Sequence, residues 1–319
     1  MILKNKKIII LGASGFIGRS LATYFSKKRY NVVGTYHNNK ISINGIKLLK
    51  CDLTKENQVI QVIKGADIVI QAAATTSGAK DIIDKPYIHV NDNAIINSMV
   101  TRACYNSNIK HVIVFSCTVM YSSSNKKQKE GDFNANKEIY HRYFGAGWTK
   151  VFIEKMCEFY SRLNKNKYTL IRHSNIYGPY DKFDLEKSHV FGATINKVVN
   201  CKNNVVTIWG NGKESRDLLY ISDLIRFVDL AIKNQKSKFE IYNVGLGKLI
   251  SINNLVKKII KYYDNKIKIK NDLTKHSLST KVILDCSKAK REIKWSPKIS
   301  LDNGIRRTLK WYLKNKDSL

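Results

Sequence analysis

Strand-length apolar runs alternate with amphipathic stretches of helical length through the first half of this chain. The β-branched runs have the length of strands and lie at 7–11, 31–35, 47–51, 68–71, 111–116 and 169–172. The helical stretches between them lie at 16–28, 54–64, 87–105 and 149–163. Strand followed by helix, repeated, is typical of a parallel sheet covered on both faces. The pattern therefore predicts an α/β fold with a doubly wound parallel sheet.

The regularity weakens after about residue 173. Shorter helical stretches follow among loops and short strands, at 190–199, 221–233, 250–263 and 301–311. We expect residues 1–173 to form the sheet domain and residues 174–319 to form a smaller α/β part, with some segments returning to the sheet. Because no Gly/Ser linker separates the two parts, we expect one compact body.

The first predicted strand runs directly into the glycine-rich loop Gly12-Ala-Ser-Gly15-Phe-Ile-Gly18, which opens the first predicted helix. Such a turn lets the backbone approach a pyrophosphate, whose charge is attracted to the helix N-terminus. Because a strand and a helix flank the loop, it indicates a dinucleotide-binding Rossmann domain and not only a tight turn. The expected cofactor contacts are Gly12, Ser14, Gly15, Phe16, Ile17, Gly18 and Arg19, with Ala72 and Ala73 at the end of the fourth strand.

The end of the second strand lacks the acidic residue that would bond a ribose 2'-hydroxyl. Arg19, His37 and Lys40 could instead receive a 2'-phosphate, so we expect NADP(H) in preference to NAD(H). The alternative is that these basic residues belong to a lysine-rich surface. Asp52 and Leu53 follow the third strand at the expected adenine pocket, although Asp52 could also cap the helix after Thr54.

The net charge of +31 raises the question of nucleic acid. The lysines are scattered, with no basic stripe interleaved with aromatic residues, which favours a solvated surface whose field would still attract an anionic nucleotide. The six cysteines lie far apart with no Cys-x-x-Cys pair, which argues against a metal site and a disulfide framework. The apolar runs are too short for a signal peptide or a membrane span. We therefore expect a cytoplasmic protein without nucleic-acid, metal or membrane partners.

Several motifs resemble those of the extended short-chain dehydrogenase/reductases, the NAD-dependent epimerase/dehydratase family. They are the glycine spacing, Gln71-Ala-Ala-Ala74, the Pro86…Asn91 helix start and Lys150. Later motifs narrow the resemblance to the GDP-L-fucose synthase group: Asn175-Ile-Tyr-Gly-Pro-Tyr180, Ser188-His189-Val190, and the stretch from Trp209 to Asp223. The resemblance covers essentially the whole chain. It implies an NAD(P)-dependent reductase and epimerase of a GDP-linked 4-keto-6-deoxy sugar, on a route to surface polysaccharide.

The family's dimer packs two helices from each subunit into a four-helix bundle, so the resemblance also implies a homodimer. The corresponding stretches here are 87–105 and 149–163. The residues that could line the interface are Met99, Cys104, Met156 and Phe159, although core packing would explain them equally well.

The proton relay of the resembled family is altered in this chain. The family uses a Ser or Thr, a Tyr, and a Lys four residues after the Tyr; these positions hold Cys117, Ala146 and Lys150. Lys150 would orient the nicotinamide ribose. The cysteine that serves the family as epimerisation base is Val119 here, whereas His189 matches the acid, so 3,5-epimerisation is in question.

Several groups could replace the missing phenol as proton donor, and the sequence does not choose among them. They are Thr118, the Cys117 thiol, His189, and a water held by Lys150, while Cys117 could equally be a small buried apolar residue. Tyr143 lies seven residues before Lys150, ~10 Å along a helix axis. Gly145 and Gly147 disfavour a helix extending that far, so we do not expect Tyr143 to take part.

The 174–319 part is expected to bind the substrate. Trp209 and Arg216 match positions that hold the nucleotide and its diphosphate in the family, and Lys197 falls where the family has an Arg. An Arg fork binds phosphate oxygens, an indole stacks on a base, and an amide donates to phosphate, the role expected of Asn175. Lys281 could add a further charge. Each residue alone could instead be a core or surface residue.

Two other functions remain open at this point. One is an NAD-dependent nucleotide-sugar 4-epimerase, in which the same hydride leaves and returns and the cofactor is retained. The other is a non-catalytic dinucleotide-binding regulator, for which Ala146 and Cys117 are the evidence.

Overall fold

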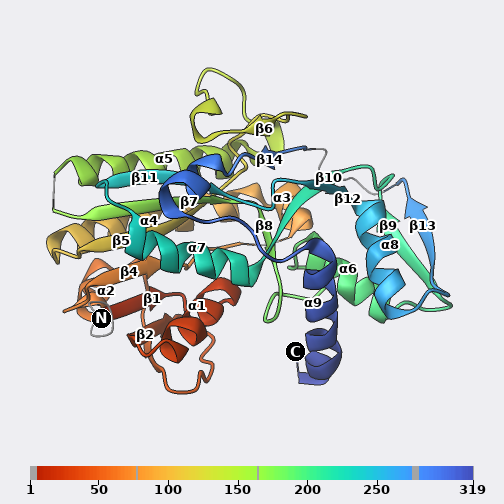
Figure 1. Cartoon of the computed structure of the whole chain (residues 1–319), viewed down its shortest axis with the longest axis horizontal. Helices are drawn as coiled ribbons and strands as arrows, with labels where there is room; N and C mark the ends of the chain where they lie inside the picture. The colour runs from red at the N-terminus through yellow and green to blue at the C-terminus, as the bar shows by residue number, and fades with distance from the viewer. Residues whose placement is uncertain (1–5, 77, 164, 275–279, 319) are drawn as a thin grey trace.

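The computed structural model describes residues 6–76, 78–163, 165–274 and 280–318. Its centre is a seven-stranded, all-parallel sheet (Figure 1). The strand order is β11 (Phe239–Val244), β7 (Lys167–His173), β5 (His111–Cys117), β4 (Ile68–Gln71), β1 (Lys7–Leu11), β2 (Asn31–Tyr36) and β3 (Lys47–Lys50). The order reverses beside β1, as in a doubly wound sheet. The predicted fold class is confirmed.

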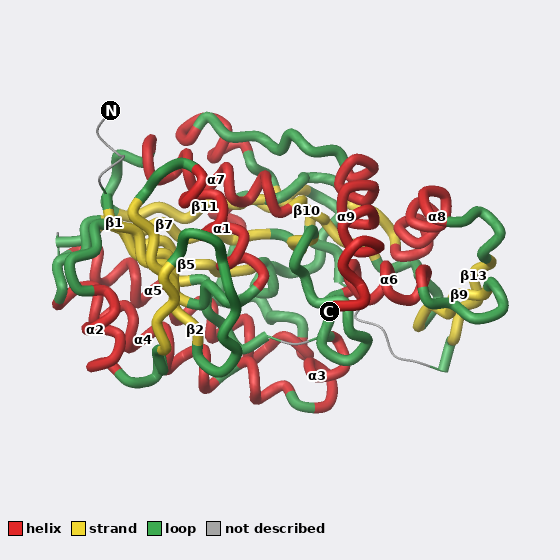
Figure 2. The backbone as a smooth tube through the Cα atoms, turned by 90° about the horizontal axis from the view of Figure 1, so that it is seen from below, coloured by secondary structure: helices red, strands yellow, loops and turns green. Residues whose placement is uncertain are grey.

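Helices cover both faces of the sheet because alternate strand residues point to opposite sides. On one face Ile8 and Ile10 pack against α1 (Phe16–Lys27) and α7 (Ile221–Asn234). On the other face Ile9 and Leu11 share a core with α2 (Glu56–Ile63), α4 (Asn91–Asn106) and α5 (Phe144–Arg162). Figure 2 shows α2, α4 and α5 on one side of the strands and α7 on the other.

The other elements lie largely beyond the carboxyl ends of the strands, on the right of Figure 1. Their small sheets are β8 (Asn175–Tyr177) with β10 (Ser215–Tyr220) and β12 (Leu249–Ser251), and β9 (Val205–Trp209) with β13 (Lys268–Asp272). Their helices are α6 (Val190–Val199), α8 (Ile252–Tyr263) and α9 (Leu301–Asn315), with a π-helical turn at Ala289–Ile293. Shorter pieces are α3 (Ala79–Asp84), β6 (Lys127–Gln128) paired with β14 (Ile283–Leu284), and 3-10 turns at Pro86–His89, Glu130–Asp132, His141–Tyr143 and Lys316–Ser318.

Several predicted helix boundaries were wrong, among them the start of the predicted 87–105 helix, which begins at Asn91, and the end of the predicted 301–311 helix, which ends at Asn315. The predicted 250–263 helix begins at Ile252 because Leu249–Ser251 pairs with β10, and the Ser251 hydroxyl caps α8 by accepting from Asn254 N. The predicted 54–64 helix begins at Glu56. The predicted 149–163 helix begins five residues earlier, at Phe144.

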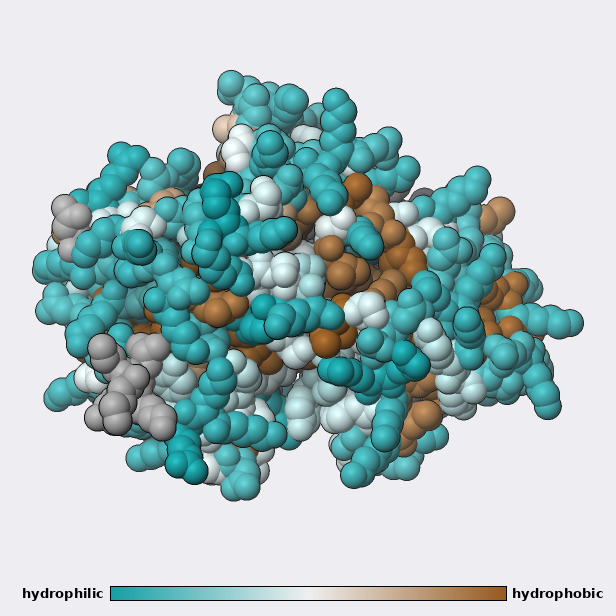
Figure 3. Space-filling view, in the orientation of Figure 1, coloured by the Kyte–Doolittle hydropathy of each residue, from teal (hydrophilic) through white to brown (hydrophobic). Residues whose placement is uncertain are grey.

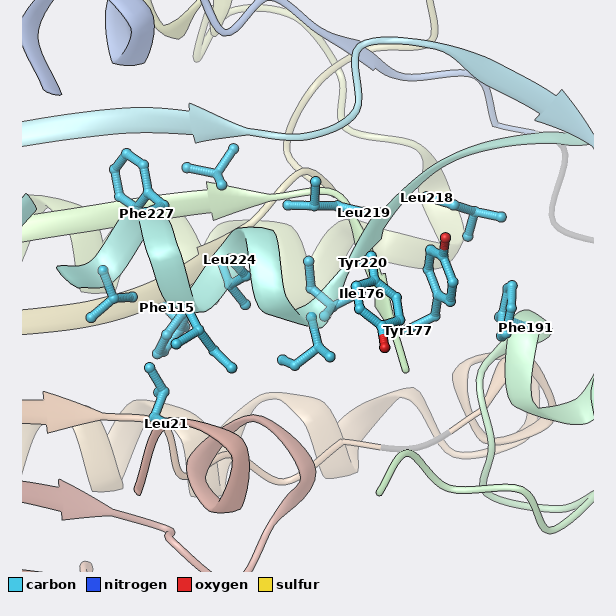
Figure 4. Packing of buried hydrophobic residues seen from close by; sticks show 14 of the residues in the cluster. Leu21, Phe115, Ile176, Tyr177, Phe191, Leu218, Leu219, Tyr220, Leu224 and Phe227 are labelled. Atoms are coloured by element: carbon cyan, nitrogen blue, oxygen red, sulfur yellow. The ribbon is translucent and has the colours of Figure 1, made fainter. Parts of the chain in front are cut away.

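Aromatic packing joins the small sheet to α6. Tyr177 on β8 stacks on Phe191 of α6 with ring centroids 4.0 Å apart, and Tyr220 on β10 meets the same tyrosine edge-on (Figure 4). All three rings are buried. This contact holds the N-terminus of α6 against β8 and β10 of the small sheet, close to the candidate site.

The surface matches the scattered lysines of the sequence. The face in Figure 3 is mostly hydrophilic, with apolar residues gathered in a few places near its middle. Within the described ranges, no helix is both long enough and apolar enough to cross a membrane.

Candidate functional site

The glycine loop after β1 leaves an open helix N-terminus. Gly12 has a backbone φ of +76°, and a Cβ there would lie 2.7 Å from Ala73 at the end of β4; at Gly18 a Cβ would lie 2.2 Å from Gly12 O. Both positions therefore require glycine. Gly15 is exposed, and its Cβ would meet only Gly12 O, at 3.4 Å. Within the described chain no side chain caps α1, so its first-turn N–H groups can face a pyrophosphate.

The other predicted cofactor residues surround this loop. Ser14, Phe16, Ile17, Ala72 and Asp52 are half-buried, Ala73 packs beside Gly12, and Leu53 is buried. Asp52 Oδ1 accepts from Thr54 N at 3.0 Å and Thr54 Oγ1 at 2.7 Å, and these bonds lower the pKa of its carboxyl. Asp52 thus closes a turn before α2 and does not cap the helix, whose N-cap is Lys55 and has no side-chain cap among the described residues.

The basic residues proposed for a 2'-phosphate lie in different surroundings. His37 and Lys40 are exposed beyond the end of β2. The Arg19 guanidinium lies 4.1 Å from the centroid of the Tyr180 ring. Tyr180, from the 174–319 part (the second part of the chain), therefore packs on α1, the helix that follows the glycine loop. This contact connects the two parts beside the cofactor loop.

Lys150 and Cys117 meet at the carboxyl end of β5. The Lys150 ammonium donates to Phe115 O at 3.0 Å, and two of its three N–H groups have no further partner among the described residues. Cys117 is half-buried. Burial raises the pKa of its thiol, and the nearby charge of Lys150 opposes that rise. The thiol is therefore mainly protonated at neutral pH.

His173 is a site residue that the sequence reasoning missed. It ends β7, in register with Cys117 on β5. Burial, together with the nearby charges of Lys150 and His189, lowers the pKa of its ring to about 4, so the ring is neutral at pH 7. Polar residues at the carboxyl ends of parallel strands are a general signal for a site, and that rule could have found it.

His189 stands at the N-cap of α6 and is exposed. It lies close enough to His173 for its charge to lower the pKa of that ring. His89 lies near His189, and its Nε2 atom is buried without a hydrogen-bond partner in the described residues. Sequence reasoning missed His89 as well, and no spacing signal pointed to it.

A buried ionic network supports this end of β5. Arg172 on β7 binds Glu154 on α5 through two nitrogens, at 2.9 and 2.6 Å, and both side chains are 4% exposed. Ser116 Oγ donates to Glu154 Oε1 at 2.6 Å, and Arg172 Nη1 donates to Tyr121 Oη at 2.8 Å. The network therefore joins α5, β5, β7 and the loop after Cys117, beside Lys150.

Arg216 approaches the site from β10. Its Nη1 donates to Thr280 O at 3.1 Å and to Ser215 O at 2.9 Å. Asp217 points the other way and is buried, where it accepts from Leu246 N and Gly247 N; burial raises its pKa to about 6. The alternative interpretation of these two residues was an ion pair at the surface. The described contacts do not include such a pair between Arg216 and Asp217.

The remaining predicted site residues lie in separate places. Asn175 lies next to Arg216 in space, because β8 pairs with β10 and its Nδ2 donates to Asp217 O at 3.3 Å. Lys197 and Trp209 form a separate pair, with the ammonium 4.8 Å from the indole centroid. Lys281 is exposed near Ser123. Thr118 is half-buried, and its carbonyl accepts from Tyr121 N.

Tyr143 also lies at the site, which the sequence did not lead us to expect. It immediately precedes α5, and the groups that act on its phenol include Cys117 and Arg216. The reason given for excluding it, a helix interrupted at Gly145 and Gly147, was wrong. Both glycines lie within α5, and each leaves room for a neighbour, since a Cβ would lie 2.8 Å from Val90 at Gly145 and 2.9 Å from Ile139 at Gly147.

The sheet order and the glycine loop define a Rossmann-type α/β protein. The chain belongs to the NAD dependent epimerase/dehydratase family, which residues 8–245 match. It is 26% identical to the GDP-L-colitose synthase of Yersinia pseudotuberculosis, over 98% of this chain and 99% of that one. It is also 26% identical to the GDP-L-fucose synthase of Azorhizobium caulinodans, over 97% of each chain.

A solved structure has the same fold. The UDP-glucose 4-epimerase of Thermotoga maritima with UDP-glucose superimposes with a TM-score of 0.85 at 23% identity, covering 97% of this chain and 99% of that one. The predicted resemblance to the epimerase/dehydratase family is thus confirmed by the match over residues 8–245, and the solved structure shows the shared fold.

Proposed function

We propose that this protein is an NADP(H)-dependent enzyme that reduces or epimerises a GDP-linked 4-keto-6-deoxy sugar. One observation carries the proposal: Cys117, which lies near Lys150 at the expected nicotinamide end, and Arg216, the expected diphosphate ligand, both lie near the Tyr143 phenol. Two similar chains are named GDP-L-colitose synthase and GDP-L-fucose synthase, which supports the GDP-sugar class.

The residues present fit a bound dinucleotide. The uncapped first turn of α1 would hold the pyrophosphate, and Lys150 would donate to the ribose of the nicotinamide. His37 and Lys40 would face a 2'-phosphate, which supports NADP(H) in preference to NAD(H). When bound, NADPH supplies the hydride for the sugar carbonyl.

The substrate would lie across the opening between the sheet ends and the second part. Arg216 and Asn175 would hold the diphosphate, and the Trp209 face beside Lys197 would stack on the base. His189 would donate to the sugar. Because Val119 stands where the GDP-L-fucose synthases have their base, we expect reduction to outweigh 3,5-epimerisation.

The test is NADPH consumption by the purified protein with GDP-4-keto-6-deoxymannose, with NADH in parallel and the product sugar identified. We expect oxidation of NADPH, faster than of NADH, and a product with a hydroxyl at C4. Tightly retained NAD and conversion of a UDP- or GDP-sugar without net oxidation would indicate a 4-epimerase instead. Binding of both ligands with no turnover of any such sugar would indicate the non-catalytic regulator.

We also propose that the protein forms a homodimer through α4 and α5. Phe144, Phe152, Phe159 and Leu163 recur along one side of α5 and are 56, 49, 57 and 42% exposed, beside Ile95 of α4 at 44%. Such an apolar stripe is typical of an interface. Cys104 cannot line it, because its side chain is fully buried in the core beneath α4.

Phe152→Glu combined with Phe159→Glu is expected to convert the dimer to a monomer, because two charges would be buried without partners. Light scattering during size-exclusion chromatography measures the mass. Leu273→Glu, at a side chain 74% exposed on the β13 turn, is the matched control and should stay dimeric. A monomeric wild type would disprove this interface.

A further inference from the structure

Tyr143 is a phenol for which the proposed function gives no role. It is the last residue of the short turn at His141–Tyr143 and directly precedes α5. Its N–H donates to Tyr140 O at 2.7 Å, and its ring meets the Tyr140 ring edge-on with centroids 5.7 Å apart. The ring also packs on the apolar cluster of Met120, Ile139 and Val151. These contacts hold a half-buried side chain in one orientation.

Two of the neighbours of the Tyr143 hydroxyl, Arg216 and Cys117, are predicted site residues, and Tyr140 and Thr280 lie beside them. Arg216 and Cys117 are close enough for their charges to act on the phenol, and the Thr280 side chain is within hydrogen-bonding reach. Thr280 is itself held to Arg216 through its carbonyl at 3.1 Å. On its other side, Cys117 is subject to the charge of Lys150. The phenol therefore lies near Cys117, at the expected nicotinamide end, and near Arg216, the expected diphosphate ligand.

We propose that Tyr143 is the proton donor of this site and takes the role that residue 146, an alanine, cannot perform. This inference rests on the proposed function. The sugar carbonyl carbon accepts the hydride, and its oxygen accepts the phenolic proton of Tyr143, so the C=O becomes H–C–O–H. The tyrosinate then regains a proton from water through the Thr280 hydroxyl. One hydride and one proton are consumed in each cycle.

The surroundings suit this role. Burial raises the pKa of the Tyr143 phenol, so the proton is present at neutral pH. Arg216 acts against that rise and would stabilise the tyrosinate formed after donation. The positive charge that acts on the phenol thus comes from Arg216 on β10.

Tyr143→Phe keeps the ring and removes only the hydroxyl, so it should leave the fold intact. We expect kcat to fall by ~10²- to 10⁴-fold, the usual contribution of a positioned general acid, with KM for the GDP-sugar little changed. Tyr140→Phe, which removes the same group from the neighbouring ring, is the matched control and should behave as wild type. The double variant Tyr143→Phe/Ala146→Tyr should regain activity. A raised KM with unchanged kcat would overturn the proposal, because the hydroxyl would then only bind the diphosphate.

A second readout needs neither substrate nor cofactor. The tyrosinate absorbance of wild type minus that of Tyr143→Phe, followed against pH, isolates the titration of this one phenol. We expect a midpoint above the ordinary value of about 10, moving higher in Arg216→Met. A midpoint that does not respond to Arg216→Met would overturn the proposal. Failure of the wild type to oxidise NADPH would instead refute the proposed function, and the titration would still decide where Tyr143 lies.

Discussion

Lys150→Met lowers turnover of the GDP-sugar by at least ~10²-fold, the loss expected when a reacting pair is misplaced by about 1 Å. The ammonium is held by Phe115 O at 3.0 Å, so it has a set position at the end of β5 from which to donate to the ribose. Methionine preserves the length of the side chain but cannot donate a hydrogen bond. The measurement is NADPH oxidation at saturating GDP-sugar, together with the Kd for NADPH by fluorescence titration.

Lys155→Met is the matched control, because Lys155 lies on the same helix with its side chain 72% exposed and paired to Glu158. It should leave both turnover and the Kd for NADPH unchanged. Equal activity in Lys150→Met and Lys155→Met would remove Lys150 from the catalytic machinery and, with it, the assignment of the β5 end as the nicotinamide site.

Arg172→Met lowers the free energy of unfolding by about 3–5 kcal/mol, the usual cost of leaving one member of a buried ion pair alone. The Glu154 carboxylate is 4% exposed, and after the change only the Ser116 hydroxyl would still bond to it. Urea denaturation at pH 7 measures the loss. Replacing both partners, as Arg172→Met/Glu154→Leu, should recover most of it, because no charge is then buried without a partner.

The surface pair of Arg162 and Glu158 on the same helix provides the control. Their side chains are 74 and 23% exposed, so Arg162→Met should change the free energy of unfolding by no more than ~1 kcal/mol. A loss in Arg172→Met as small as that in Arg162→Met would contradict the network. Because the network anchors the loop after Cys117, we expect Arg172→Met to lower activity as well, even at urea concentrations too low to unfold the protein.

The bounds of several elements could be predicted because local pattern and tertiary structure agree there. β1, β4 and α6 begin and end at the predicted residues. At α5 the two disagree: glycine is a poor helix former, so Gly145 and Gly147 indicated a loop. In the folded chain these glycines allow Val90 and Ile139 to approach the helix closely, and packing outweighs a propensity cost of about 1 kcal/mol for each.

The sequence by itself determined the doubly wound sheet, the glycine loop and the position of Lys150, since each depends on residues that are close together in the chain. Local spacing carries this information because strand and helix periods act over a few residues. Only the tertiary structure decided that His173 lies beside Cys117, that Glu154 pairs with Arg172, and that Tyr143 lies near Arg216. These residues are 18 to 73 positions apart or meet across the sheet, and no sequence period links them. Their meeting follows from the packing of α5 and of the second part against the carboxyl ends of β5 and β7.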